Sequence, residues 1–226
     1  MHVVITAAGQ SQRFGGGNKL LQPLCGRPVL GWTLAAFEAC RQVDAVYVTA
    51  PAEDEALYRT LLVDFAPRTG REVVVGGEHR QASIHHALQR LAQAPPELVA
   101  VHDGARPLLS PALVEALREA CRTSGHGVVP GAPVSDTIKR IEGAFVQATV
   151  DRASLVAVQT PQVFPWRVLW SAHERAAAEG FVGTDDASLV ERYGATVSVV
   201  RGEPWNIKVT LPHDLWLAEQ WLKRKT

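Results

Sequence analysis

A loop of small and basic residues follows the first apolar run of the sequence. The stretch TAAGQSQRFGGGNK, residues 6–19, comes directly after Val3-Val4-Ile5 and contains the cations Arg13 and Lys19. Small residues let backbone N–H groups approach an anion closely, and arginine and lysine add fixed positive charge. A nucleotide triphosphate is the ligand that this chemistry indicates. The alternative is a flexible surface loop whose charges are incidental.

The spacing of this loop excludes two common phosphate-binding motifs. A P-loop needs serine or threonine after its lysine, but Lys19 is followed by Leu20. The dinucleotide fingerprint needs glycine two residues after Gly9, where Ser11 stands. The loop therefore indicates neither a P-loop NTPase nor a Rossmann dehydrogenase.

A carboxylate follows another apolar run. Asp103 lies in VHDGARP, residues 101–107, at the end of a predicted buried strand. A carboxylate there can hold Mg²⁺, which takes few protein ligands and shares its coordination with phosphates. The alternative is that Asp103 caps the following turn. Metal phosphohydrolases also use a His-Asp pair, but the sequence lacks their further ligands, so we expect His102 to be structural.

Regular elements must bring these residues together. Short valine-rich runs alternate with amphipathic stretches, which predicts a Rossmann-like α/β fold: three α/β/α layers around a mostly parallel, twisted sheet. Ligands bind at the carboxyl edge of such a sheet, so the loop and Asp103 should meet there. We predict strands at residues 2–7, 45–49, 72–75, 98–102, 127–129 and 196–200, and helices at 28–40, 52–65, 80–92, 111–123, 166–179, 185–193 and 212–225.

Residues 132–158 do not follow this alternation of strand-like and helix-like stretches. The stretch DTIKRIEGAFVQATVDR alternates like a strand pair, with halves at 137–141 and 144–150 around a turn at Glu142-Gly143. An isolated hairpin is marginally stable in water, so a second subunit is expected to cover it. We therefore expect one domain, residues 1–226, with residues 132–158 as a β-hairpin arm used for dimerisation.

The composition narrows the class of protein. The chain has 226 residues, a formal net charge of +0 and 46% hydrophobic residues, which predicts a sizeable core and gives no sign of nucleic-acid or membrane binding. Its cysteines, Cys25, Cys40 and Cys121, form no CxxC pair, which favours a reducing compartment over a disulfide framework or zinc site. The first apolar run is too short for a signal peptide, so we expect a cytoplasmic protein.

Several motif-like stretches occur in a specific order. Ala7-Ala8-Gly9, Arg13 and Lys19 match the AAG…R…K pattern of sugar-phosphate nucleotidyltransferases. The further stretches are GGEHRQAS (76–83), VHDGARP (101–107), APVSDTIKR (132–140), VDR (150–152), QTPQVF (159–164), TDDAS (184–188) and NIKVT (206–210). Over essentially its whole length, the chain thus resembles the 2-C-methyl-D-erythritol 4-phosphate cytidylyltransferase family of that superfamily.

The resemblance implies a Mg²⁺-dependent enzyme of the non-mevalonate isoprenoid pathway. It would transfer CMP from CTP to 2-C-methyl-D-erythritol 4-phosphate and release pyrophosphate. Since both reactants are anions, catalysis depends on positioning and on neutralising charge. By the resemblance, Arg13, Lys19 and Lys208 are the catalytic cations and Asp103 holds Mg²⁺. The alternative for Lys208 is a solvated lysine in a strand.

The resemblance also implies a nucleotide-binding set of mostly small residues. The cytosine edge would be recognised by backbone groups, with Ser83 near the ribose or base. An ordinary strand-to-helix turn is the alternative for Gly76-Gly77. Gly104 stands where the family usually has alanine and allows a similar close approach. The expected nucleotide-binding residues are Ala7, Ala8, Gly9, Gly77, Ser83 and Gly104.

The acceptor site implied by the resemblance comprises Asp103, Arg106, Thr137, Arg152 and Thr184. Arg106 would face a phosphate of either substrate. Thr137 and Arg152 lie on the arm and would complete the partner's site in a homodimer. Thr184 could also be a helix N-cap, and Arg152 could instead pair with a neighbouring aspartate.

Two other functions remain open at this point. A cytidylyltransferase for another polyol phosphate, such as ribitol 5-phosphate, would have a nearly identical nucleotide site, although Arg152 and Thr184 favour methylerythritol phosphate. A non-catalytic nucleotide-binding module could share the fold. Such a module is expected to have lost a cation or the metal carboxylate, whereas Arg13, Lys19, Asp103 and Lys208 are all present.

Overall fold

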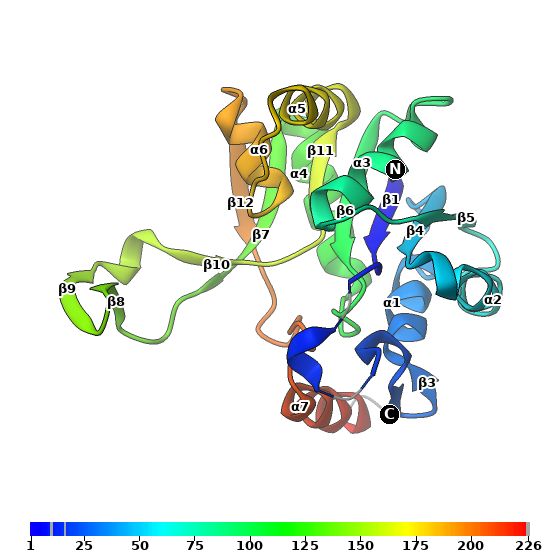
Figure 1. Ribbon diagram of the computed structural model, residues 1–226, viewed down its shortest axis with the longest axis horizontal. Coiled ribbons are helices and arrows are strands. Elements are labelled where there is room, and N and C mark those ends of the chain that lie inside the picture. The colour runs from blue at the N-terminus through cyan, green and yellow to red at the C-terminus, as the bar shows by residue number, and fades with distance from the viewer. Residues whose placement is uncertain (10, 16, 225–226) are drawn as a thin grey trace.

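The computed structural model describes residues 1–9, 11–15 and 17–224. Gln10 and Gly16 of the basic loop, and Lys225 of the last predicted helix, lie outside the described residues. One mixed sheet forms the centre, in the order β10-β7-β11-β6-β1-β4-β5, with β12 paired to β7 (Figure 1). Its strands are β1 (His2–Thr6), β4 (Ala45–Ala50), β5 (Gly70–Val75), β6 (Leu98–Asp103), β7 (Gly127–Pro133), β10 (Val156–Val158), β11 (Gln162–Pro165) and β12 (Val197–Arg201).

Helices cover both faces of this sheet, which confirms the predicted three-layer α/β fold. One core cluster contains Leu34 of α1, Tyr58 of α2 and Leu117 of α4, and the other contains Ile84 of α3 and Leu169 of α5. The helices are α1 (Val29–Glu38), α2 (Glu55–Phe65), α3 (Arg80–Leu91), α4 (Pro111–Ser124), α5 (Trp166–Glu179), α6 (Asp186–Arg192) and α7 (Pro212–Lys223). Short pieces are η1 (Gln12–Phe14), η2 (Lys19–Leu21), η3 (Ala52–Asp54), η4 (Arg152–Ser154), β2 (Pro23–Leu24) and β3 (Arg27–Pro28).

The strand register places polar side chains side by side at the carboxyl edge. β1 runs parallel to both β4 and β6, and Thr6 at its end is in register with Thr49 and with Asp103. Upstream of these residues, Val3 and Ile5 pack into one core cluster and Val4 into the other, as the two-residue period of a strand requires. The last residues of these buried strands therefore lie together at the carboxyl edge of the sheet, where the basic loop also begins.

The mixed part of the sheet departs from the prediction. β11 runs antiparallel to β6 and β7, between which it lies. The prediction rests on the alternation of strands and helices. β11 has only four residues and no helix connects it to β10, the strand before it, so this alternation does not reveal it. β7 also extends past the predicted strand at 127–129, to Pro133.

The predicted hairpin is present and projects from the α/β body (Figure 1). It comprises β8 (Ile138–Glu142) and β9 (Phe145–Val150), which pair antiparallel. The turn is Gly143-Ala144, one residue later than predicted, because Glu142 still pairs with Phe145 and Gly143 adopts a φ of 56° that suits glycine. The ends of the range 132–158 belong to β7 and β10 of the main sheet.

Candidate active site

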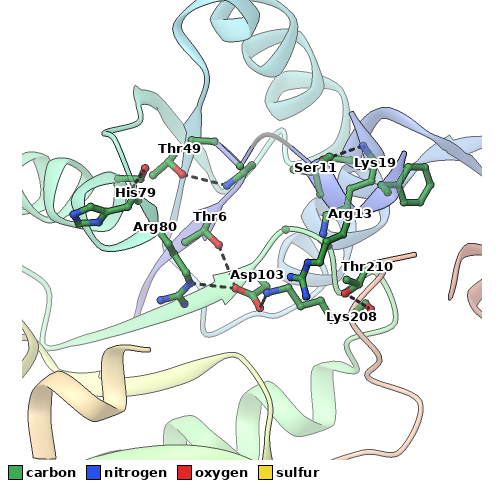
Figure 2. Close-up of a pocket in the computed structure, with 18 of the residues that line it drawn as sticks. Thr6, Ser11, Arg13, Lys19, Thr49, His79, Arg80, Asp103, Lys208 and Thr210 are labelled. Atoms are coloured by element: carbon green, nitrogen blue, oxygen red, sulfur yellow. Dashed lines mark hydrogen bonds and ion pairs between the residues drawn. The ribbon is translucent and has the colours of Figure 1, made fainter. Parts of the chain in front are cut away.

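A pocket of about 660 Å³ opens at the carboxyl edge of the sheet (Figure 2). Its walls come from the basic loop, the ends of β1, β4 and β6, the start of α3, and the segment between β12 and α7. Most of the predicted site residues therefore meet, although they come from distant parts of the sequence. Those that line the pocket are Ala7, Ala8, Gly9, Arg13, Lys19, Gly77, Ser83, Asp103, Gly104 and Lys208.

Asp103 is the buried anionic centre of this pocket, with only 7% of its surface exposed. Its Oδ2 lies 2.7 Å from Nζ of Lys208 and 3.8 Å from Nε of Arg106. Its Oδ1 accepts a hydrogen bond from Thr6 Oγ1 (3.3 Å) and lies 3.4 Å from Nε of Arg80. Burial alone would raise the pKa of the Asp103 carboxyl, but Arg80 and Lys208 hold it well below its usual range. Asp103 is therefore ionised at neutral pH.

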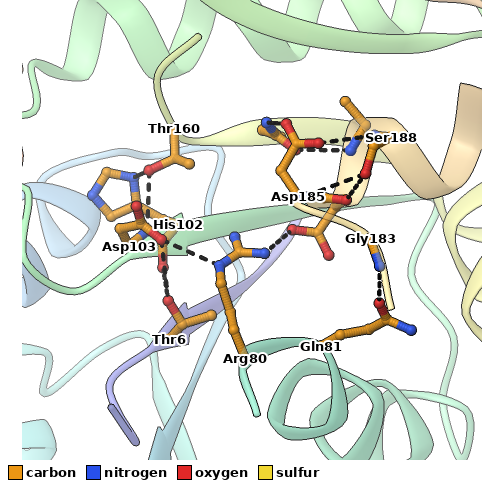
Figure 3. Close-up of polar contacts among 12 residues, drawn as sticks. Thr6, Arg80, Gln81, His102, Asp103, Thr160, Gly183, Asp185 and Ser188 are labelled. Carbon is orange, nitrogen blue, oxygen red and sulfur yellow. Dashed lines mark hydrogen bonds and ion pairs between the residues drawn. The ribbon is translucent and has the colours of Figure 1, made fainter. Parts of the chain in front are cut away.

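Arg80 is a pocket residue that the sequence analysis did not assign. Its guanidinium contacts Asp103 (Figure 3). It also contacts Asp186, with Nη1 2.8 Å from Oδ2 of that residue, and so bridges the two carboxylates. The other oxygen of the fully buried Asp186 lies 3.0 Å from Nε2 of His173. Arg80 stands within GGEHRQAS at the first turn of α3, so its basic charge beside the predicted base-binding glycines was the available signal.

The basic loop presents its two cations to the pocket from short helical turns. Arg13 in η1 is exposed, whereas its neighbour Phe14 is buried in the core. Lys19 begins η2, and the following Leu20 is also buried in the core. Burial, Lys208 and Arg13 together lower the pKa of Lys19, against the opposing effect of Asp103. A lowered lysine pKa beside other cations marks a site where a bound anion would be stabilised.

The small residues leave room where a ligand would lie. A Cβ added at Gly9 would meet nothing within 4 Å, whereas one at Gly76 would lie 2.4 Å from Cβ of Ala8. Gly77 donates its N–H to Ser83 Oγ at 3.0 Å, so this backbone donor is already used inside the chain. The N–H of Gly104 is likewise donated to the carbonyl of Thr6. Recognition at Gly77 and Gly104 is therefore left to close approach and to their carbonyl groups.

His102 and Arg106 lie behind the pocket rather than in its lining. His102 is fully buried, with Nδ1 3.1 Å from Thr160 Oγ1 and Nε2 3.3 Å from the Arg106 carbonyl oxygen. Burial lowers its pKa to about 3, so the ring is neutral, in agreement with the structural role predicted for it. Arg106 directs its guanidinium to the Asn206 carbonyl oxygen (2.7 Å), in addition to Asp103.

Thr184 lies beside the main pocket. It lines a smaller hollow of about 130 Å³ whose wall includes Arg80, which the two cavities share. The alternative role of Thr184 as a helix N-cap is wrong: Asp185 is the N-cap of α6, and its Oδ1 accepts a hydrogen bond from the N–H of Ser188 at 2.9 Å.

The predicted arm residues are not in the pocket of their own chain. Thr137 and Arg152 are both exposed, and Arg152 donates a hydrogen bond to the carbonyl of Ser135. The expected alternative, an ion pair of Arg152 with Asp151 or Asp136, is not seen among the described residues. Arg152 lines a separate hollow at the base of the arm.

The donor set suits a metal that takes most of its coordination from elsewhere. In the part of the chain that the structure describes, no three His, Cys, Asp or Glu side chains gather as a metal site. Asp103 is an ionised carboxylate in a pocket whose lining also contains cations, small residues and one further acidic residue, Glu78. This fits Mg²⁺, which is commonly held by one or two carboxylates together with substrate phosphates, and does not fit a structural zinc site. Among the described residues, no helix has the length and apolarity needed to cross a membrane.

Comparison with known proteins gives a consistent result. The family model of IspD, 2-C-methyl-D-erythritol 4-phosphate cytidylyltransferase, matches residues 1–224. Proteins of that name from Thermosynechococcus vestitus and Bacillus velezensis are each 44% identical, over 100% and 99% of this chain and 96% of each relative.

Solved structures agree with these relatives. The 4-diphosphocytidyl-2C-methyl-D-erythritol synthase from Anaerococcus prevotii superposes with a TM-score of 0.86 and 30% identity, covering 99% of this chain and 98% of that one. The 2-C-methyl-D-erythritol 4-phosphate cytidylyltransferase from Thermus thermophilus has a TM-score of 0.79 and 36% identity, covering 97% and 98%.

Proposed function

We propose how the pocket works in this chain, which belongs to the 2-C-methyl-D-erythritol 4-phosphate cytidylyltransferase family. The chain is an enzyme of the non-mevalonate isoprenoid pathway. It transfers a cytidylyl group from CTP to 2-C-methyl-D-erythritol 4-phosphate, giving the CDP-linked polyol and pyrophosphate.

The reaction sets a problem of charge. A phosphate oxygen of the acceptor attacks the α-phosphorus of CTP, a new P–O bond forms, and the bond from that phosphorus to the departing pyrophosphate breaks. Negative charge grows on the bridging oxygen and the leaving group. Fixed cations that contact these oxygens most strongly in the transition state accelerate the step.

In our proposal Arg13, Lys19 and Lys208 are those cations. Arg13 can hold two phosphate oxygens in its planar fork, and the lysines act as point charges. The observation that carries this assignment is that the three cations converge on one pocket. Lys208, from the segment after β12, contacts Asp103, and both Lys208 and Arg13 repel the charged form of Lys19. Burial is the largest cause of the lowered pKa of Lys19, and repulsion by Lys208 and Arg13 adds to it; the negative charge of a bound triphosphate would act against both effects.

Asp103 is the residue proposed to hold Mg²⁺. When bound, Mg²⁺ would supply Lewis-acid stabilisation to phosphate oxygens. The chain's own contribution is to keep Asp103 ionised and oriented, through Arg80 on one oxygen and Lys208 on the other. Thr6 also fixes Oδ1 by its hydrogen bond.

The base and ribose are assigned to the small-residue side of the pocket. Gly9 faces open space, and Ala7, Ala8, Gly77 and Ser83 line the same pocket. Gly104 continues this surface next to Asp103. Because side chains there are short, a nucleotide can lie close to the backbone, which is what recognition of the cytosine edge requires.

The acceptor is assigned to the region beside Arg80. Thr184 lines the adjoining hollow, and Asp103 stands at the boundary. A phosphate role for Arg106 stays a prediction, since its guanidinium is directed to Asn206 and Asp103. Thr137 and Arg152 would act on the acceptor bound to a partner subunit.

A homodimer is proposed to bring the arms into use. Large apolar side chains of the arm are exposed: Ile141 by 64%, Phe145 by 76% and Val146 by 61%. An unpartnered hairpin with such a surface needs a covering partner. Residues 1–226 would form one domain with residues 132–158 as its dimerisation arm. The free cysteines favour action in the cytoplasm.

Pyrophosphate release by Lys208→Ala tests the assignment of the cations. Loss of a positioned charge of this kind typically lowers kcat by about 10²–10³. The matched control is Lys223→Ala, an exposed lysine of α7 paired with Glu219, which should retain normal turnover. Normal turnover by Lys208→Ala would overturn its catalytic role.

A further inference from the structure

A buried tyrosine connects the two ends of the basic loop. Tyr58 of α2 is 0% exposed and does not line the pocket. Its hydroxyl donates a hydrogen bond to the carbonyl of Ala7 at 3.3 Å and accepts one from Nδ2 of Asn18 at 2.8 Å. Ala7 stands directly after β1, and Asn18 directly before η2, so a single oxygen atom links the start and the end of the loop.

Each end of the loop has further attachments that make this link effective. Ala7 donates its N–H to Oγ1 of the buried Thr49, which fixes the first end to β4. Asn18 Oδ1 accepts a hydrogen bond from the N–H of Leu20, which caps η2 at the other end. The two sides of the Asn18 amide therefore have different partners, and only the Nδ2 side depends on Tyr58.

The cations stand next to these anchored points. Lys19 follows Asn18 directly, and its own N–H is donated to Ser11 Oγ at 3.3 Å. Ser11 has the left-handed backbone conformation, φ 52° and ψ 26°, which non-glycine residues rarely adopt without support. Arg13 lies in the turn between, held by the buried ring of Phe14. A change in the separation of the loop ends would be passed to both cations.

The hydroxyl is suited to a permanent link. Burial raises the pKa of Tyr58 to about 12, so the group stays protonated and can donate to Ala7 while it accepts from Asn18. A phenylalanine ring would occupy the same space. It would, however, leave the Ala7 carbonyl and the Asn18 amide without this partner.

We propose that Tyr58 is a positioning residue for the nucleotide triphosphate: its hydroxyl fixes the distance between Ala7 and Asn18 and thereby the placement of Arg13 and Lys19. This inference rests on the proposed role of these two cations. Tyr58 does not line the pocket, so it acts only through the loop.

The test is Tyr58→Phe in the full-length protein, with tryptic cleavage after Arg13 and Lys19 measured under native conditions. Loss of two hydrogen bonds that stabilise the closed loop should raise the cleavage rate at these sites by about tenfold. Calorimetry should show CTP, with Mg²⁺ present, binding about tenfold more weakly, while KM for the acceptor stays unchanged. Tyr47→Phe is the control, because Tyr47 is buried in the core cluster on the other face of the sheet; it should change neither quantity.

Asn18→Ser provides a second variant that keeps an uncharged oxygen acceptor for the N–H of Leu20 and removes the donor to Tyr58. It should reproduce the faster cleavage, and the double variant should add little to either single change. Unchanged cleavage in both single variants would overturn the link. Faster cleavage with unchanged CTP affinity would overturn the positioning role. Lys19→Ala is measured in parallel to separate the two proposals. If Lys19→Ala also binds CTP with normal affinity, the proposed role of the loop cations is wrong; if it binds CTP weakly, only the positioning role of Tyr58 is wrong.

Discussion

Nζ of Lys208 lies 2.7 Å from Oδ2 of Asp103, which joins the segment after β12 to the end of β6. Asp103 is buried and ionised, and its partner lysine retains 37% of its side-chain surface exposed. The pair thus places an anchored anion at the base of the pocket and a cation at its surface. When phosphates and a metal ion enter, Lys208 can contact a phosphate and Asp103 can contact the metal ion in place of each other.

Asp103→Asn should weaken the Mg²⁺ response of the enzyme. The amide keeps nearly the same volume but loses the charge that holds a divalent cation, so kcat should fall by about 10² or more and the Mg²⁺ concentration for half-maximal activity should rise. Chelation of Mg²⁺ should stop the wild-type enzyme, and added Mg²⁺ should restore it. The control is Asp64→Asn on the exposed side of α2. A Mg²⁺ titration identical to that of the wild type would contradict the assignment.

Arg80→Gln should destabilise the fold as well as the site. It leaves the fully buried Asp186 with His173 as its remaining side-chain partner and removes one cation from Asp103. Removing one member of a buried pair typically costs about 3 kcal/mol of unfolding free energy. Urea unfolding measures this cost. Arg90→Gln, on the same helix but with an exposed pair to Glu72, should cost less than about 1 kcal/mol; equal losses would refute the bridging role.

His102 should make the protein less stable in mild acid. Its folded-state pKa of about 3 lies below the ordinary value of 6.5, so between these values the unfolded chain binds a proton that the folded chain does not. The unfolding free energy should therefore fall as pH decreases below 6.5, by up to about 1.4 kcal/mol per pH unit from this residue. Urea unfolding between pH 7 and pH 5 should show a smaller slope for His102→Gln. A slope in His102→Gln equal to that of the wild type would contradict this contribution of His102.

If the arm acts on the partner's acceptor, two inactive chains should restore each other. Lys19→Ala damages the pocket, whereas Arg152→Ala damages only the arm, so a hybrid dimer contains one intact site. Mixing the two variants should recover up to about a quarter of wild-type pyrophosphate release, the share expected from random pairing with one intact site in each hybrid.

Phe145→Glu provides the control for this experiment. It places a charge on the exposed apolar surface of the arm, which should shift the protein to monomer in sedimentation and prevent the recovery. Hybrids that form but remain inactive would count against an arm that acts in trans.

The sequence was informative where one physical signal dominates. Valine-rich runs end at Thr6 and Asp103, and parallel pairing brings these ends into register, so the site at the carboxyl edge was predictable. The loop cations and Lys208 were assigned from motif order, and they line the same pocket.

The parts that were missed depend on partners that a linear pattern does not reveal. Arg80 is held in the site by ion pairs with Asp103 and Asp186, which are distant in the sequence and come close to it only in the folded chain. The link from Tyr58 to Ala7 and Asn18 depends on the tyrosine hydroxyl. The apolar pattern of α2 explains why the ring is buried, but it does not reveal the partners of the hydroxyl. β11 is short and antiparallel, and neither its length nor its hydropathy distinguishes it from a loop.

The central claim is that this pocket joins CTP to methylerythritol phosphate. Its most direct test is pyrophosphate release with each of the four nucleoside triphosphates and Mg²⁺, against 2-C-methyl-D-erythritol 4-phosphate and ribitol 5-phosphate. We expect release with CTP and methylerythritol phosphate and with no other pair. Release with ribitol 5-phosphate instead, or with a different nucleotide, would contradict it.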